Sequence, residues 1–285
     1  MQELLKNGLR ELGLDTEKAE TLAHFAALML AKNAVMNLTR ITEPDAVAQL
    51  HLLDSAALLR FADLRGKKAV DVGTGAGFPG MPLRILEPDF DLTLLDSLGK
   101  RVEWLREACD TLSLRRVECV HARAEEFAAE KREQFDFALS RAVANLQVLC
   151  ELCLPLVCVG GRFLAMKSVD SDEEINAAKN AVKTLGGKIA AIEDYTIPTS
   201  SVVHRLVIIE KTAPTPKGYP RAFAKIKKSP LSLCERSLRF VSGHRRGVRQ
   251  GRHRKNFIRF AHRCGTLAAR QKNARAGLRH RSSQP

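Results

Sequence analysis

The sequence predicts an α/β protein built on a doubly wound sheet, and three observations carry that prediction. A short apolar strand breaks into a glycine-rich turn over residues 68–80, KAVDVGTGAGFPG. Strand-like runs then alternate with helix-like segments up to about residue 168, which is typical of a parallel sheet covered by helices. Residues 171–210 read as a helix followed by two strand-like runs that Ile197–Pro198 separates. We therefore expect a terminal antiparallel strand pair.

The residues before the glycine turn read as an N-terminal helical extension. Apolar residues recur at helical spacing up to Gly13 and again up to residue 32, and a third helix is expected over 44–61. His51 and Asp54 lie three residues apart in that third helix and therefore on one face of it. A lone histidine on an apolar helix is more often structural, but both residues are kept as site candidates.

The remaining elements follow from apolar runs and from the glycines and prolines between them. The expected strands cover 69–72, 92–95, 117–120, 135–140, 163–166, 188–195 and 202–210, and the expected helices include 100–112 and 171–185. Gly160 and Gly161 are interpreted as a turn that leads into the fifth strand.

The glycine turn predicts a ligand site. Gly73, Gly75 and Gly77 carry no Cβ atoms, so backbone N–H groups at the start of a helix can approach a ligand closely. Asp71 stands two positions before the first glycine, where dinucleotide sites usually have an apolar residue. An acid there is typical of enzymes that use S-adenosylmethionine (SAM), whose amino group and sulfonium are cationic. Asp96 ends the next strand and is expected to hold ribose hydroxyls.

A nicotinamide-dependent oxidoreductase is the alternative that the same turn allows. Gly75, Gly77 and Gly80 satisfy the spacing Gly-x-Gly-x-x-Gly of a dinucleotide site. A dehydrogenase of this size would normally have a separate substrate domain after its nucleotide-binding half. Here a basic segment follows instead, which favours a SAM-dependent methyltransferase.

Two further candidates lie after later strands. Glu125 follows the third strand and is placed to meet the adenine amino group, although acids at a helix start also occur without a ligand. Arg141 ends the fourth strand, at the carboxyl edge where a doubly wound sheet opens its crevice. We therefore expect Arg141 where cofactor and substrate meet.

The composition indicates the cellular compartment that we expect and bears on membrane insertion and metal binding. No apolar run reaches the length of a membrane span and the N-terminus is charged, so neither a membrane segment nor a signal peptide is expected. Seven cysteines in mostly apolar contexts fit a reducing cytoplasm. Cys150 and Cys153 have a metal-type spacing but no second pair, so no metal site is expected.

The net charge of +14 is concentrated near the C-terminus, where residues 212–285 hold 20 Lys and Arg and one acidic residue. Such a segment favours a polyanionic partner, most simply a nucleic acid. We divide the chain into a helical cap on the substrate side (1–62), a methyltransferase domain (63–211) and a basic extension (212–285), disordered past 235. A monomer is expected.

Eight motifs connect the chain to a known family. In order they are NAVMNLTRIT, HLLDS, VDVGTGAGFPGMPL, LTLLDSLGKRVEWL, SRAVA, GGRFLAMK, HRLVIIEK and YPR. Together they resemble the bacterial 16S ribosomal RNA methyltransferase G family, also called glucose-inhibited division protein B. The resemblance covers about residues 3–231. It implies transfer of a methyl group from SAM to N7 of one guanosine in 16S ribosomal RNA, naked or within the small subunit or an assembly intermediate.

The resemblance also implies which residues contact SAM. It assigns this role to Gly73, Phe78, Ala124, Glu125 and Arg141; some members of the family have Leu at the position of Phe78. With the residues from the glycine turn and the next strand, the predicted cofactor site comprises Asp71, Gly73, Thr74, Gly75, Gly77, Phe78, Asp96, Ala124, Glu125 and Arg141.

Methylation at N7 of guanine needs no general base, because that nitrogen carries a lone pair and no proton. No single catalytic residue is therefore assigned, and Arg141, His51 and Asp54 are the candidates for holding the guanine or its phosphates. A methyltransferase acting on another RNA position is a second alternative.

Overall fold

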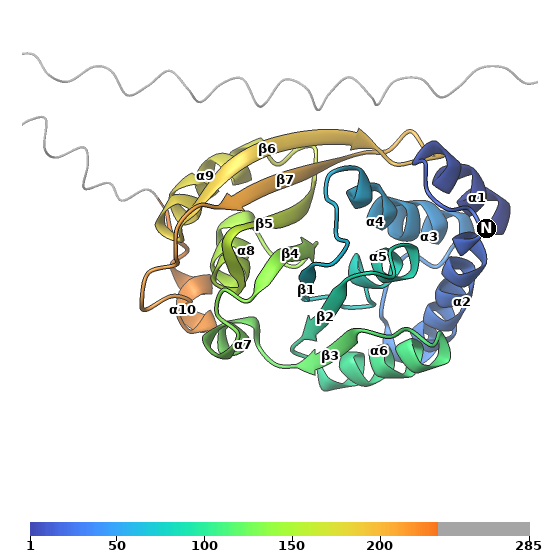
Figure 1. Ribbon diagram of the computed structural model, residues 1–285, viewed down its shortest axis with the longest axis horizontal. Coiled ribbons are helices and arrows are strands. Elements are labelled where there is room, and N and C mark those ends of the chain that lie inside the picture. The colour runs from blue at the N-terminus through green and yellow to red at the C-terminus, as the bar shows by residue number, and fades with distance from the viewer. Residues whose placement is uncertain (233–285) are drawn as a thin grey trace, which may run out of the picture. The chain divides into compact units, whose positions relative to one another are not determined.

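The computed structural model describes residues 1–232, which belong to one compact unit (Figure 1). The expected disorder past residue 235 lies outside the described residues. Of the helices within 1–232, none is both long and apolar enough to span a membrane.

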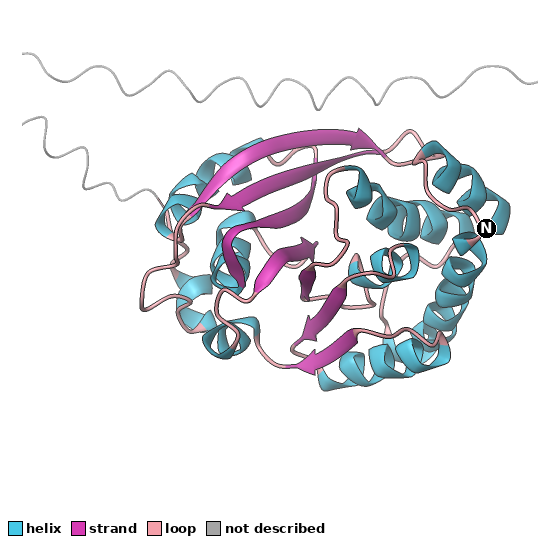
Figure 2. Ribbon diagram, in the orientation of Figure 1, coloured by secondary structure: helices cyan, strands magenta, loops and turns pink. Residues whose placement is uncertain are grey.

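Within this described part, seven strands form one sheet in the order β3-β2-β1-β4-β5-β7-β6 (Figure 2). They are β1 (Lys68–Val72), β2 (Asp91–Asp96), β3 (Val117–His121), β4 (Phe135–Arg141), β5 (Val157–Ser168), β6 (Gly187–Thr196) and β7 (Val203–Lys211). Strands β1 to β5 are parallel, and β7 runs antiparallel to both β5 and β6. The predicted doubly wound fold with a terminal antiparallel pair is confirmed.

The described helices before residue 212 occupy the predicted positions, with one difference in their regularity, whereas α10 (Phe223–Lys228) lies in a segment that the sequence predicted to be extended. They are α1 (Gln2–Glu11), α2 (Lys18–Met36), α3 (Pro44–Val47), η1 (Ala48–Leu53), α4 (Asp54–Ala56), η2 (Ala57–Arg60), α5 (Gly80–Leu86), α6 (Gly99–Thr111), α7 (Ala124–Glu130), α8 (Leu146–Cys153), η3 (Leu154–Leu156), α9 (Asp172–Thr184) and α10 (Phe223–Lys228). The expected helix over 44–61 is continuous, but its middle, η1, is wound as a π-helix. Such wider turns are frequent at functional sites.

Apolar side chains fill two cores, one on each face of the sheet. Ala69 of β1 belongs to the core that contains residues of α1, α2, α5 and α6, while Val70 and Val72 belong to the core formed with α8 and α9. Because both faces of β1 are covered, this strand is apolar almost throughout, as buried parallel strands are. Asp71 is the exception and lies on the first of these faces.

The start of β5 differs from the prediction. The strand begins at Val157, and Gly160 and Gly161 lie inside it at a shift in register with β4. Gly160 has a φ of +90°, and a Cβ atom on Gly161 would lie 2.5 Å from the carbonyl oxygen of Asp136. The two glycines therefore form a bulge where backbones pass closely, and not the turn that the sequence predicted.

The segment that follows β7 packs against the second core. Ile226 is fully buried there, and Arg221 makes a bidentate ion pair with the fully buried Glu151 of α8. The guanidinium of Arg132 donates to the carbonyl oxygens of Thr215 and Tyr219. Residues 212–232 are thus attached to the sheet by buried polar contacts as well as by apolar packing.

Candidate functional site

The glycine turn connects β1 to α5 and has the tight geometry that the sequence predicts. Gly73, Gly75 and Gly77 all have positive φ angles, +73°, +61° and +105°. At Gly77 a Cβ atom would also lie 2.7 Å from Met81 Cγ and 3.1 Å from Leu105 Cδ2. Both the backbone conformation and the close packing therefore exclude a side chain at this position.

A cavity of about 450 Å³ opens beside this turn, at the carboxyl ends of β1, β2 and β4. Its lining residues are Leu38, Thr39, His51, Gly73, Thr74, Gly75, Ala76, Phe78, Asp96, Ser97, Leu98, Arg101, Arg141, Ala142 and Val143. Strands β2 and β3 lie on one side of β1, and β4 and β5 lie on its other side, so the order of strands reverses between β1 and β4. This is the switch point at which doubly wound folds bind ligands. Most of the predicted site residues line one cavity.

Asp96 is held in place at the floor of the cavity. One carboxylate oxygen accepts from the Gly75 N–H at 3.0 Å, and the other accepts from the Leu98 N–H at 2.9 Å. Arg101 lies 3.5 Å from the same carboxylate. The carboxylate therefore joins the glycine turn to the start of α6 and presents a fixed negative charge to the cavity.

Asp71 does not line the cavity. It is fully buried below the turn, where Oδ2 accepts from the Gly80 N–H at 2.9 Å and Oδ1 has no hydrogen-bond partner among the described residues. Burial raises the pKa of Asp71 to about 6, against the opposing effects of the neighbouring Thr74 hydroxyl, the Gly80 N–H and Arg141. The Thr74 hydroxyl is close enough to lower this pKa but makes no hydrogen bond of normal geometry with Oδ1. Its contact with a cationic ligand stays a prediction.

Three other residues predicted to contact the cofactor also lie outside the lining of the cavity, as does the candidate Asp54. Gly77 faces α5 and α6. Ala124 and Glu125 are half-buried at the start of α7, beyond the end of β3, whose last residue His121 is paired with Asp96. These residues are at the predicted edge of the sheet, and their contact with the ligand stays a prediction.

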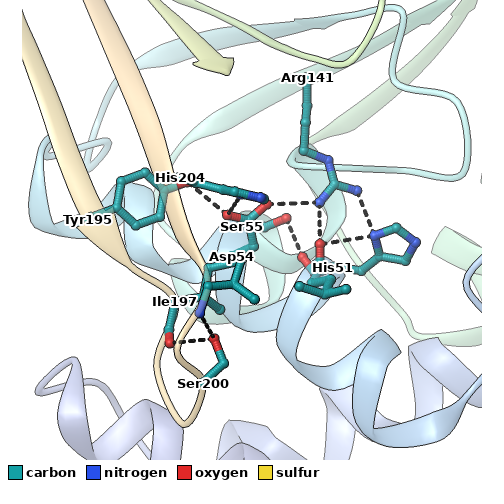
Figure 3. Close-up of polar contacts among 10 residues, drawn as sticks. His51, Asp54, Ser55, Arg141, Tyr195, Ile197, Ser200 and His204 are labelled. Carbon is teal, nitrogen blue, oxygen red and sulfur yellow. Dashed lines mark hydrogen bonds and ion pairs between the residues drawn. The ribbon is translucent and has the colours of Figure 1, made fainter. Parts of the chain in front are cut away.

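Arg141 joins β4 to the π-helical turn (Figure 3). Its Nη1 donates to the carbonyl oxygen of Leu50 at 2.9 Å and to Asp54 Oδ2 at 3.2 Å. The guanidinium also lies 4.8 Å from the centre of the Phe78 ring. A cation is therefore fixed at the cavity wall by an anion, a carbonyl dipole and an aromatic face.

His51 completes this cluster. Its ring stacks on Phe78 with 4.6 Å between ring centres, Nδ1 lies 3.1 Å from Arg141 Nη2, and Nε2 lies 2.8 Å from Thr39 Oγ1. Burial and the charge of Arg141 lower the pKa of His51 to about 4. The ring is therefore neutral near pH 7, and Nδ1 also lies 3.1 Å from the carbonyl oxygen of Leu50. The three candidates Arg141, His51 and Asp54 are thus brought together.

Known proteins resemble this chain over most of its length. The family model described as rRNA small subunit methyltransferase G matches residues 18–203. The chain belongs to this family. A relative from Alkaliphilus metalliredigens, named ribosomal RNA small subunit methyltransferase G, is 45% identical over 80% of this chain and 98% of its own length. A relative of the same name from Clostridium novyi is 44% identical over 78% and 92%.

The resemblance predicted from the motifs is thereby confirmed. Among solved structures, TrmN from Thermus thermophilus is 22% identical over 55% of this chain and 48% of that chain, with a TM-score of 0.42. Because this structural similarity is weak, the fold of this member of the methyltransferase G family is assigned from its strand order.

Two residues of the cluster were missed by the sequence analysis. Tyr195 of β6 donates to Asp54 Oδ1 at 2.8 Å, and His204 Nδ1 lies 2.9 Å from the same oxygen. Both come from the antiparallel pair, about 140 residues or more from Asp54 along the chain. His204 is the first residue of HRLVIIEK, one of the eight motifs that resemble the family, so this motif could have indicated His204 as a candidate.

The arrangement can bind and orient a ligand, but it offers no free base. Asp54 is fully buried, and both it and Asp96 accept hydrogen bonds at both oxygens, while both ring nitrogens of His51 have partners. Arg141 provides a positive charge at the cavity wall, and Asp96 provides a negative charge at its floor. In this member of the methyltransferase G family, the chemistry supported by these residues is positioning and electrostatic selection.

Proposed function

We propose that this chain is a SAM-dependent methyltransferase that methylates N7 of a specific guanosine in 16S ribosomal RNA. The substrate is the RNA in the small ribosomal subunit or in an assembly intermediate, and the enzyme acts as a cytoplasmic monomer. Residues 1–62 serve as a cap on the substrate side, 63–211 as the methyltransferase domain and 212–285 as a basic extension. Membership of the methyltransferase G family supports the reaction class and the RNA substrate.

The observation that carries the proposal is the pair of acids around the glycine turn. Asp96 lies at the cavity floor, and Asp71 lies beneath the turn with one carboxylate oxygen unpartnered. Of the two acids, Asp71 is the one that discriminates, because a carboxylate directly beneath the turn favours the cationic amino group of SAM over a pyrophosphate. Asp96 stands where ribose hydroxyls are bound in doubly wound folds. The residues present therefore fit SAM better than a nicotinamide dinucleotide.

The strand order favours the same choice. The dinucleotide-binding order ends with its sixth strand next to the fifth, whereas here the antiparallel β7 separates β5 from β6. The oxidoreductase alternative is therefore not favoured.

The mechanism that we derive is one of alignment. When bound, SAM supplies a methyl group on an electrophilic sulfonium. Arg141 is fixed beside the cavity, where its remaining N–H groups are available to the oxygen of a guanine or to a phosphate. Holding the reacting atoms in line supplies about 7–11 kcal/mol in favourable cases.

The absence of a free base among the cavity residues favours N7 over an exocyclic amine. An exocyclic amine loses a proton when it is methylated, and a nearby base would have to accept it. Both ring nitrogens of His51 have polar partners, and both oxygens of Asp96 accept from backbone N–H groups, so neither residue is free to take that proton. N7 carries no proton, so the cavity as built is sufficient for that reaction.

The test is mass mapping of 16S RNA from cells with and without the gene, together with transfer by purified wild-type and Arg141→Ala protein. We expect one methylated guanine to disappear without the gene, and the variant to lose transfer strongly at a temperature at which it is still folded. The unfolding midpoint of the variant should fall, because Asp54 loses its buried ion pair. A missing methyl group at another base would refute the N7 assignment. Wild-type turnover in the Arg141→Ala variant would remove Arg141 from the site.

A further inference from the structure

Arg141 is held by a chain of contacts that begins at the far edge of the sheet. Its partner Asp54 is a fully buried carboxylate on α4. Oδ2 of Asp54 faces Arg141, and Oδ1 accepts from two donors on the antiparallel pair, Tyr195 and His204 (Figure 3). The orientation of this carboxylate is therefore set by strands that do not line the cavity.

We propose that Tyr195 and His204 are positioning residues that fix Arg141 through Asp54. The proposal rests on the proposed function in one respect, because it takes Arg141 as a residue that contacts the substrate or the cofactor.

The geometry supports action through Asp54 and not through direct contact. Neither Tyr195 nor His204 is among the residues that line the cavity. Tyr195 is 4% exposed, and its ring packs against Phe61 and edge-on to His204. With both donors on Oδ1, the carboxylate cannot rotate without breaking two hydrogen bonds, so Oδ2 remains directed at Arg141.

The π-helical turn η1 also holds the Arg141 guanidinium. Leu50 lies in η1, and its carbonyl oxygen accepts from the same Nη1 that contacts Asp54. Nη2 points to His51 Nδ1. The guanidinium thus contacts three polar groups on one helical segment, and Asp54 is the one whose direction depends on β6 and β7.

Burial explains why Tyr195 remains a donor. Burial and the neighbouring charge of Asp54 raise the pKa of the Tyr195 hydroxyl well above its usual range. The phenol therefore keeps its proton at any pH at which the protein would be assayed. Losing either donor leaves a buried carboxylate oxygen with one hydrogen bond fewer, and the carboxylate is then free to turn away from Arg141.

The experiment compares Tyr195→Phe, His204→Leu and His204→Asn with wild type in methyl transfer to 16S RNA. We expect Tyr195→Phe and His204→Leu to lower kcat/KM by between about 10- and 100-fold, the range seen when a positioned group shifts by a fraction of an ångström to one ångström. His204→Asn keeps an N–H donor near the position of Nδ1 and should recover most of the loss. Tyr219→Phe removes the hydroxyl of the chain's other tyrosine and is the matched control.

A second readout separates positioning from a general loss of stability. In an Arg141→Lys background the ammonium cannot contact all three polar groups, so Tyr195→Phe should lower kcat/KM by less than about twofold. A purely structural role would lower kcat/KM by the same factor in both backgrounds, and that result would overturn the proposal. So would wild-type kinetics in the Tyr195→Phe/His204→Leu double variant.

Crystal structures test the position of the Arg141 guanidinium without relying on the proposed function. The double variant should show the Arg141 guanidinium displaced from Asp54, whether or not the wild-type protein methylates this RNA. A guanidinium in its wild-type position would refute the inference. Absence of methyl transfer by wild type, with the displacement present, would refute the proposed function alone.

Discussion

Replacing Asp71 with Asn should change how stability depends on pH, because this buried carboxyl has a raised pKa. Burial raises the pKa of Asp71 from 3.8 to about 6. As pH rises, the folded state therefore keeps this proton longer than the unfolded state does. Stability from the protonated carboxyl is fully present below about pH 4 and is lost as pH rises through 6.

The size of the effect follows from the difference in pKa. About two pKa units correspond to about 3 kcal/mol, at 1.36 kcal/mol for each unit. The Asp71→Asn variant has no such titration, yet its amide oxygen can still accept from the Gly80 N–H. The free energy of unfolding of wild type minus that of the variant should therefore fall by about 3 kcal/mol between pH 4 and pH 7.

Urea unfolding at several pH values, without added SAM, measures this difference directly. Asp63→Asn is the control of opposite sign, because hydrogen bonds from the exposed Arg65 lower the pKa of Asp63 to about 2. There the stability contributed by the ionised carboxyl is lost as pH falls. A wild-type minus Asp71→Asn difference that stays constant, or that rises with pH, would refute the reasoning.

Two further predictions concern buried charges. Arg221→Ala leaves the fully buried Glu151 without its ion pair and should lower the free energy of unfolding by about 3–5 kcal/mol. Arg65→Ala, at an exposed ion pair, should shift the urea midpoint far less. Equal shifts for the two variants would contradict this. The lowered pKa of His51, about 4, predicts that its ring signals in NMR do not titrate between pH 5 and pH 8. A midpoint near 6.5, the value of a free histidine, would show that burial and Arg141 do not act on the ring as described.

Local patterns in the sequence were sufficient for the sheet and for most of the cavity. Strand β1, the glycine turn and Asp96 are close in sequence, and their spacing directly fixes how one βαβ unit folds. The position of Arg141 followed from a rule about the carboxyl ends of parallel strands, and the structure places it on the cavity wall. The bulge at Gly160 and Gly161 was misread because glycine has the same sequence signature in a turn and in a bulged strand.

Contacts between distant segments could not be read in this way. The pairing of Asp54 with Tyr195 and His204 depends on β7 entering the sheet between β5 and β6, which brings the antiparallel pair above α4. The sequence predicted that pair but did not give its place in the strand order. The same insertion distinguishes this sheet from a dinucleotide-binding one. The position of β7 between β5 and β6 therefore argues against the oxidoreductase alternative and also brings Tyr195 and His204 to the carboxylate that contacts Arg141.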